Sequence, residues 1–218
     1  MNAPAPLTTH PRLITLEGGE GAGKTTALWA MREALQAAGH AALCTREPGG
    51  TPLAEDIRKL LLHGDGESMA AHTELLLMFA ARVQHVRQAI VPALERGMFV
   101  LCDRFTDSSY AYQGGGRGID ARFIADLERE TVGIRPGLTL LLDVDVAVGQ
   151  ARAHGRDGGA DRIEREQHAF FQRVRQVFLQ RAQAEPERFA VLDASQSPEH
   201  VAAQAVARLQ AHVRELRA

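Results

Sequence analysis

A glycine-rich segment near the N-terminus constrains what this chain can fold into more than any other part of the sequence. It matches the pattern G-x-x-x-x-G-K-[ST], and its residues are Gly18, Gly19, Glu20, Gly21, Ala22, Gly23, Lys24 and Thr25. Residues 13–16 before it are apolar and β-prone, and residues 26–38 after it have a helical pattern. A strand, a glycine loop and a helix in this order aim backbone N–H groups and the positive end of a helix dipole at one point. The segment therefore predicts a phosphate-binding loop (P-loop), and the alternative is a glycine-rich turn that binds nothing.

Two side chains of this loop have the chemistry that a phosphate ligand needs. Lys24 can neutralise the β- and γ-phosphates of a nucleotide, and the hydroxyl of Thr25 can bind Mg²⁺. The loop is therefore expected to bind a nucleotide through its terminal phosphates.

The rest of the chain alternates short apolar segments with helical patterns. Four more buried strands are expected, at residues 41–45, 98–102, 138–143 and 189–192. Helical patterns cover residues 52–63, 69–95, 120–132, 144–150, 163–183 and the segment that begins at Ser197. This alternation predicts an α/β fold of the P-loop kinase type, with a five-stranded parallel sheet and helices on both faces.

Prolines and glycines mark the expected irregular segments. Residues 1–11 contain three prolines and are expected to be a flexible tail, so that a single domain covers residues 12–218. Pro92 is expected to loosen the last turns of its helix. Residues 114–118 are expected to form a flexible loop.

Composition and charge narrow the class of protein. The net charge of −2 provides no overall attraction to nucleic acid, and no apolar run is long enough to span a bilayer. Cys44 and Cys102 lie in apolar, strand-like runs and are expected to be buried thiols in a reducing compartment. The sequence therefore predicts a cytoplasmic protein with no nucleic-acid or membrane partner.

Charged residues follow three of the expected strands, at the edge where parallel sheets bind ligands. Arg104 can bond two phosphate oxygens at once, and Asp103 can hold Mg²⁺ through water or orient Arg104; the alternative is a structural pair. Arg46 and Glu47 can contact a substrate, pair with each other or lie in a solvated loop. Asp143 has the form of a carboxylate that holds Mg²⁺ in other P-loop proteins.

Two further segments hold candidate site residues. In the helix 69–95, spacing favours Phe79 as a core residue, whereas Arg82 needs a partner because it borders an apolar stripe. Residues 152–162 are basic and broken by glycines, so they can form a lid that brings an arginine to a transferring phosphate. The lid candidates are Arg152, Arg156 and Arg162, and an exposed loop without function is the alternative. Arg117 can reach a phosphate or be solvated. Residues 193–197 form the loop after the last strand and can border an adenine ring.

Among P-loop proteins, the sequence favours a small-substrate phosphotransferase. It has no N-K-x-D or T-K-x-D element for reading guanine, and it is short for a motor. Taken together, its motifs resemble those of bacterial thymidylate kinases. They are, in chain order, EGGEGAGKTT (17–26), TREPGGT (45–51), DRF (103–105), AYQGGGRG (111–118), DRIE (161–164) and LDA (192–194). The resemblance covers nearly everything from residue 12 to the C-terminal helix.

The resemblance implies transfer of the γ-phosphate of ATP to dTMP with Mg²⁺, giving dTDP and ADP for dTTP biosynthesis. It implies that ATP is bound by the P-loop, from Gly18 to Thr26. Lys24 would be both an ATP ligand and a catalytic residue, and Thr25 and Asp103 would bind magnesium.

For dTMP, the resemblance implies a second set of residues. This set is Glu20, Arg46, Phe79, Arg82, Arg104, Ser108, Tyr112 and Gln113. Arg104 would hold the phosphate, Phe79 would stack on thymine and Arg82 would bond its carbonyl edge. Glu20 would meet the sugar 3′-hydroxyl, and Tyr112 would crowd the 2′ position and disfavour ribose.

The family has two arrangements of its catalytic arginine, one in the P-loop and one in the lid. Gly21 stands in the loop here, so the sequence resembles the lid type. Either Arg152 or Arg156 can then be catalytic, in addition to Arg104. The resemblance also implies a homodimer packed through long helices. Two other functions stay open: another nucleoside or nucleoside-monophosphate kinase, and a non-catalytic ATP-dependent switch.

Overall fold

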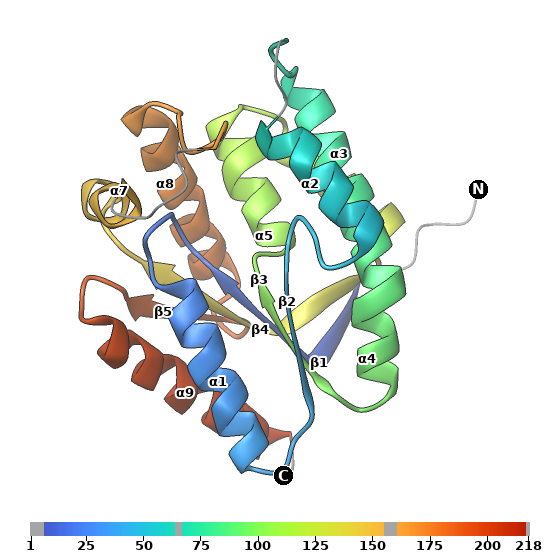
Figure 1. Ribbon diagram of the computed structural model, residues 1–218, viewed down its shortest axis with the longest axis vertical. Coiled ribbons are helices and arrows are strands. Elements are labelled where there is room, and N and C mark those ends of the chain that lie inside the picture. Colours follow the sequence, from blue (N-terminus) through green and yellow to red (C-terminus); the bar gives the residue numbers. More distant parts are fainter. Residues whose placement is uncertain (1–6, 64–66, 155–160, 217–218) are drawn as a thin grey trace.

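Five parallel strands form the centre of the structure, a computed structural model that describes residues 7–63, 67–154 and 161–216 (Figure 1). The strands are β1 (Thr8–Glu17), β2 (Ala42–Arg46), β3 (Phe99–Asp103), β4 (Ile134–Asp143) and β5 (Phe189–Asp193). Their order across the sheet is β2-β3-β1-β4-β5. The predicted five-stranded parallel sheet is therefore confirmed.

Helices connect the strands and cover the sheet. The α-helices are α1 (Lys24–Ala37), α2 (Pro52–His63), α3 (Ala71–His85), α4 (Val91–Glu95), α5 (Thr106–Ser109), α6 (Ala121–Leu127), α7 (Val146–His154), α8 (His168–Ala184) and α9 (Pro198–Glu215). Three π-helical segments are η1 (Val86–Ile90), η2 (Tyr110–Gly116) and η3 (Glu128–Val132). Within the described ranges, none of the helices has the length and apolar character needed to cross a membrane.

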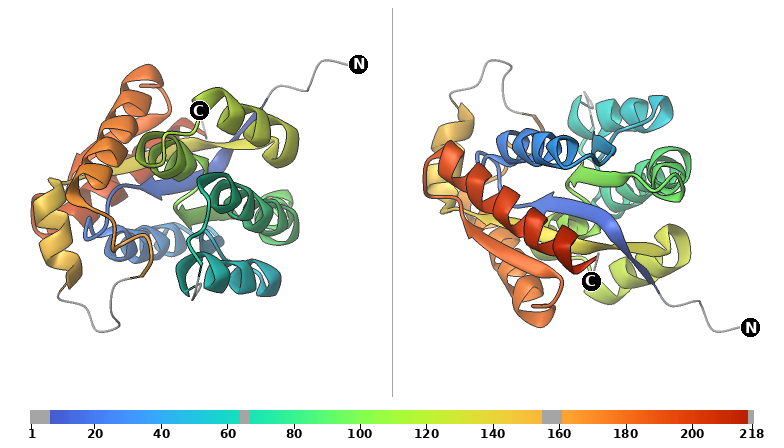
Figure 2. Two further views of the ribbon diagram at one scale, coloured as in Figure 1. Left: turned by 90° about the horizontal axis from the view of Figure 1, so that it is seen from above. Right: turned by 90° about the horizontal axis from the view of Figure 1, so that it is seen from below.

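The two faces of the sheet carry different helices (Figure 2). Ile14 and Leu16 of β1 join a buried apolar cluster with α1 and α9 on one face. Leu13 joins a cluster with α3 and α4 on the other face, and Leu141 of β4 joins one with α8. Successive strand side chains point to opposite faces, and both faces are buried, which explains why the strands read as continuous apolar runs.

The first strand is longer at its N-terminal end than expected. Residues 8–11 were expected to belong to a flexible tail, but Thr8 and His10 pair with Ile134 and Pro136 of β4. The register shifts between His10 and Ile14, which accommodates a proline that has no N–H to donate to the ladder. That part of the tail prediction was wrong, because neighbouring backbone pairing outweighed local composition.

Two helical segments also differ from expectation. The predicted helix 69–95 is present as α3, η1 and α4, with Pro92 in the first turn of α4, immediately after the π-helical segment. Residues 114–116, expected in a flexible loop, belong instead to η2. A Cβ at Gly115 would lie 2.6 Å from Cγ2 of Val177, and one at Gly116 would lie 2.4 Å from the ring of Phe170. These glycines therefore serve close packing against α8 and do not make the segment flexible.

Candidate active site

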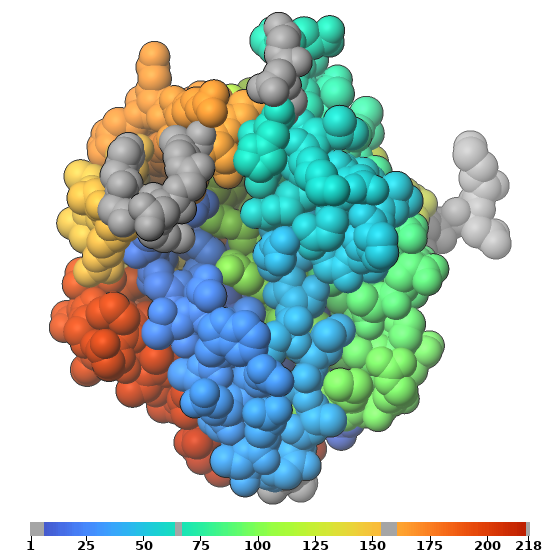
Figure 3. All heavy atoms as spheres, in the orientation of Figure 1, coloured from blue at the N-terminus to red at the C-terminus, as the bar shows by residue number. Residues whose placement is uncertain are grey.

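The candidate site lies at the carboxyl ends of β1 and β3, which are neighbours in the sheet. Leu16 of β1 is level with Asp103 of β3, and the connections that follow these strands run to opposite sides of the sheet. Ligands bind at such a topological switch point because the diverging connections leave a crevice. A cavity of about 760 Å³ opens there, between the α1 side and the α2 side of the molecule (Figure 3).

Most of the predicted site residues line this one cavity. They are Glu20, Gly21, Ala22, Gly23, Lys24, Thr25, Thr26, Arg46, Arg82, Asp103, Arg104, Ser108, Tyr112, Gln113 and Arg152. The structure thus brings together segments that lie more than a hundred residues apart in the chain.

The P-loop forms one end of the cavity. The side chain of Lys24 is buried, and its Nζ donates to the carbonyl oxygens of Gly18 at 3.2 Å and Gly19 at 2.8 Å. Burial, followed by repulsion from Arg104, lowers the pKa of Lys24. Gly18 and Gly19 therefore position the lysine, whereas the exposed Thr25 sits on the cavity wall.

Helix α7 packs directly on the P-loop. A Cβ on Gly21 would lie 2.1 Å from the carbonyl oxygen of Gly149, and one on Gly149 would lie 2.5 Å from the carbonyl oxygen of Glu20. Gly21 also has φ of 68°, a conformation that side chains other than glycine rarely adopt. Glycine is therefore needed at both contact positions.

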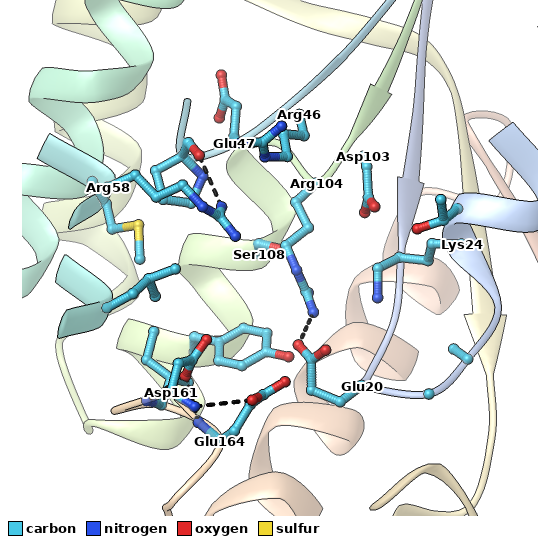
Figure 4. A pocket seen from close by; sticks show the side chains of 18 of the residues that line it. Glu20, Lys24, Arg46, Glu47, Arg58, Asp103, Arg104, Ser108, Asp161 and Glu164 are labelled. Atoms are coloured by element: carbon cyan, nitrogen blue, oxygen red, sulfur yellow. Dashed lines mark hydrogen bonds and ion pairs between the residues drawn. The ribbon is translucent and has the colours of Figure 1, made fainter. Parts of the chain in front are cut away.

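Arg104 faces the P-loop across the cavity (Figure 4). Its guanidinium donates to Glu20 at 2.5 Å and to the carbonyl oxygen of Gly18 at 3.0 Å. Its backbone has φ of 69°, which costs on the order of 1 kcal/mol for a residue with a Cβ. Strain of this kind is found at functional sites that are held in place by their surroundings.

Glu17, at the end of β1, supplies part of that support. Its carboxylate is fully buried and accepts hydrogen bonds from the backbone N–H of Phe105 at 2.7 Å and from Oγ of Ser108 at 2.6 Å. Burial, with repulsion from Asp107, raises the pKa of Glu17 to about 8. Sequence reasoning assigned no role to Glu17, because it reads as the last residue of a strand and its partners are about ninety residues away.

Arg82 fulfils the expectation that it needs a partner. Its Nε donates to Glu47 at 2.6 Å, Nη1 to Ser109 at 2.9 Å and Nη2 to the carbonyl oxygen of Phe105 at 3.0 Å. Glu47 also bonds His85 at 3.1 Å. Arg82 borders the cavity but is fixed by residues from two segments, the one after β2 and the one after β3.

The structure does not bring Phe79 to the cavity. Phe79 is 3% exposed and belongs to the core cluster on the α3 face, where its ring lies 4.8 Å from the Arg82 guanidinium carbon. Met78 lines the cavity instead. At about 100° per residue, Met78 is rotated about 40° to one side of Arg82 and Phe79 about 60° to the other. Residues on both sides can face the same cleft by spacing alone, so only packing decides between them.

Residues of η2 and the segment before it form the floor. Tyr112 lies under Arg104, with 5.0 Å between the ring centre and the guanidinium carbon. Its buried hydroxyl has no hydrogen-bond partner in the described part of the chain. Gln113 donates to Glu74 at 2.8 Å, and Ser108 lies 3.3 Å from Nη1 of Arg104.

Arg46 lines the cavity. Its ion-pair partner is Glu55 and not its neighbour Glu47. Arg46 donates to Glu55 of α2 at 2.9 Å, and Glu55 also accepts from the backbone N–H of Gly50 at 2.9 Å. Arg58, on the same helix, lines the cavity as well and donates to the carbonyl oxygen of Pro48 at 2.9 Å. Sequence reasoning missed Arg58, because a polar residue on an amphipathic helix carries no signal of its own.

The structure describes two of the three lid arginines, and they have different positions. Arg152, in α7, donates to the carbonyl oxygens of Ala194 at 2.7 Å and Ser195 at 3.0 Å, in the loop that follows β5. Arg162 turns away from the P-loop and donates to Leu61 and Glu74. Arg156 lies outside the described residues. The expectation that Arg162 supplies charge to a phosphate is not met.

Asp143 is also placed differently from the expectation. Both of its carboxylate oxygens accept from Arg175 of α8, at 2.7 and 3.0 Å, and it does not line the main cavity. The magnesium role that its position after a strand suggested is therefore not supported. Asp103, by contrast, lines the cavity, and its buried Oδ1 has no hydrogen-bond partner among the described residues.

A phosphate loop at one end of a cavity and a guanidinium fixed opposite it define the class: a P-loop protein of the phosphotransferase type. Protein-family comparison narrows this class, because the family model described as thymidylate kinase matches residues 16–205. The chain belongs to the thymidylate kinase family, whose members are enzymes.

Individual relatives agree with this assignment. The chain is 59% identical over 189 residues to a thymidylate kinase of Pseudomonas putida (strain GB-1), covering 86% of this chain and 90% of the relative. It is 56% identical over 191 residues to one of Alcanivorax borkumensis, covering 87% and 91%. The crystal structure of thymidylate kinase from Ehrlichia chaffeensis superposes with a TM-score of 0.75 at 31% identity, covering 94% of this chain and all of that one.

Proposed function

We propose that this chain transfers the γ-phosphate of ATP to dTMP, producing dTDP and ADP for dTTP biosynthesis. One observation supports this most directly: Arg104 and Lys24 of the P-loop line the same cavity, which is large enough for a monophosphate. Two phosphate groups can therefore meet between fixed positive charges from opposite sides. Membership of the thymidylate kinase family supports dTMP as the acceptor.

The reaction needs no covalent enzyme intermediate. An oxygen of the dTMP phosphate attacks the γ-phosphorus of ATP, and the bond to the β,γ-bridging oxygen breaks as ADP leaves. That attacking oxygen is already anionic, so a strong general base is unnecessary. Catalysis then consists of alignment and charge neutralisation by Lys24, Arg104 and a lid arginine.

The same geometry supports a set of roles for the residues in the dTMP half of the cavity. Arg104 would hold the phosphate, Glu20 the 3′-hydroxyl and Arg82 the carbonyl edge of thymine. Arg104 and Glu20 form a hydrogen bond with each other in this structure. When dTMP binds, this bond would break and each side chain would bond dTMP in its place. Tyr112 would exclude a 2′-hydroxyl. Met78 takes the base-contact role that the resemblance had implied for Phe79, since Met78 lines the cavity.

Magnesium fits the residues present. Asp103 presents a buried oxygen that has no hydrogen-bond partner in the parts of the chain that the structure describes, and the hydroxyl-bearing Thr25 lies on the same cavity. Oxygen ligands of this kind suit Mg²⁺, which keeps several waters and the nucleotide phosphates as its other ligands. The ion would neutralise charge on the β- and γ-phosphates when bound.

The adenine end of the site is assigned to the loop after β5. Arg152 bonds two carbonyls of that loop, so we place it beside the adenine of ATP and leave the transferring phosphate to Arg156. That second assignment rests on the sequence alone.

We also propose a homodimer in the cytoplasm. Exposed apolar side chains lie on α2, α3 and α6, namely Leu53, Leu60, Leu76 and Phe123, and such residues support a helical interface. Both cysteines are free thiols, in keeping with a reducing compartment.

A coupled ADP-release assay with dTMP, dUMP, dCMP, UMP and AMP tests the proposal. We expect dTMP to be the fastest acceptor, and UMP to be poor because Tyr112 crowds its 2′-hydroxyl. Faster turnover of a different monophosphate would make the chain another nucleoside-monophosphate kinase. ATP binding without ADP release for any acceptor would indicate a switch protein.

A further inference from the structure

Glu74 is a buried carboxylate that joins three separate segments behind the dTMP half of the cavity. It lies in the first turn of α3 and is 1% exposed. It accepts from Nε2 of Gln113 at 2.8 Å, from Nη2 of Arg162 at 2.6 Å and from Nε of Arg117 at 3.2 Å. Glu74 is not among the residues that line the cavity, so it cannot contact the substrate itself.

One partner of Glu74 belongs to the floor of the cavity. Gln113 is 1% exposed and lines the cavity at the end where dTMP is proposed to bind. Because its amide nitrogen donates to Glu74, the orientation of the amide group is fixed. A change at Glu74 would free this amide to turn.

The second partner holds a wall of the same cavity. Arg162 donates through Nε to the carbonyl oxygen of Leu61 at 2.9 Å, near the end of α2, and its backbone N–H donates to Leu62 at 3.2 Å. Its neighbours Asp161 and Glu164 face the cavity (Figure 4).

This wall is a closed local turn. Oδ1 of Asp161 accepts from the backbone N–H groups of Ile163 and Glu164, both at 2.8 Å, and the backbone N–H of Asp161 donates to Glu164 at 3.0 Å. The turn is therefore rigid in itself, and the guanidinium of Arg162 anchors it to the rest of the protein.

The charges around Glu74 are balanced only when it is ionised. Burial alone would raise its pKa, but the hydrogen bonds from Gln113, Arg117 and Arg162 lower it. Arg117 also pairs with Glu166, so two guanidiniums face two carboxylates. Removing the charge of Glu74 would leave two half-buried guanidiniums with one carboxylate, and repulsion between Arg162 and Arg117 would push their segments apart.

We propose that Glu74 is a positioning residue for dTMP, because it holds Gln113 and the 161–164 turn at their places on the cavity. This inference rests on the proposed function. The expected effect is confined to dTMP, because the side-chain partners of Glu74 within the described ranges are Gln113, Arg117 and Arg162, and none of them belongs to the P-loop or to the loop after β5.

The test is Glu74→Gln, which preserves size and removes the charge. We expect the KM and the calorimetric Kd for dTMP to rise on the order of tenfold, because small misplacements of binding groups cost this much or more. The KM for ATP should stay within about twofold. Arg162→Gln should raise the KM for dTMP by a smaller factor, since Glu74 keeps Arg117 as a partner. If Glu74→Gln does not fold, the KM for dTMP of Arg162→Gln tests the proposal.

Glu128→Gln is the matched control. Glu128 is 5% exposed, accepts from the hydroxyl of Tyr110 at 2.7 Å and lies away from the cavity lining. The Glu128→Gln variant should have a lower Tm than the wild type and an unchanged KM for dTMP. The proposal is overturned if Glu74→Gln leaves dTMP binding unchanged, or if it impairs dTMP and ATP equally, as a general loss of structure would. Failure of the wild-type protein to turn over dTMP would instead contradict the proposed function.

Discussion

The two ends of the cavity are built in different ways. At the proposed ATP end, one short segment of backbone forms the P-loop, and Lys24 is held by carbonyl groups of its own loop. At the proposed dTMP end, the site is assembled from side chains of α3, of η2 and of the segments that follow β1 and β3, and ion pairs such as Arg82–Glu47 hold it. The P-loop part of the first end is local in sequence, whereas the second end exists only after the sheet has formed. Substitutions should therefore act on catalysis at one end and on dTMP affinity at the other.

The largest expected effect is at the ATP end. Lys24→Met should lower kcat by about a hundredfold or more, because a preorganised charge on the transferring phosphate is lost. The only other lysine in the sequence, Lys59, is exposed and pairs with Asp56, so Lys59→Met is the matched control. Steady-state kinetics measures both variants. Similar kcat values for Lys24→Met and Lys59→Met would contradict the claim that substitutions at the ATP end act on catalysis.

A smaller effect is expected from Arg104→Ala. The substrate phosphate would lose its bidentate partner, so the KM for dTMP should rise by on the order of ten- to a hundredfold, while the KM for ATP changes little. Separate titrations of the two substrates measure this. If ATP affinity fell and dTMP affinity did not, Arg104 would belong to the ATP end.

The smallest effect concerns the scaffold beneath the dTMP end. Gly116→Ala would force a methyl group against the ring of Phe170, so the free energy of unfolding should fall by about 1–3 kcal/mol. Gly114→Ala, in the same π-helical segment, is the control, because its Cβ would lie 3.4 Å from Ile124, an ordinary contact. Chemical denaturation distinguishes them, and equal stability of the two variants would show that close packing of η2 on α8 is not required.

The same contrast explains what the sequence could predict. The P-loop, the sheet and the positions of Asp103 and Arg104 follow from patterns within single segments, and the structure agrees with them. Helical spacing favoured Phe79 as a core residue, and the structure agrees, whereas the resemblance implied that Phe79 stacks on thymine. No pattern pointed to Met78, because only the packing of α3 on the sheet decides which of the two residues reaches the cavity. The sequence could not predict the partners of Glu17 and Glu74 either, because each partner lies more than thirty residues away in the chain and contributes no local pattern.

The contact between Gly21 and Gly149 restricts how this protein can evolve. An arginine introduced at position 21 would collide with the backbone of α7 before its side chain reached any phosphate. If the catalytic arginine of this chain lies in the lid, as we propose, moving it to position 21 requires a shift of α7 as well, so a single codon change would not be enough.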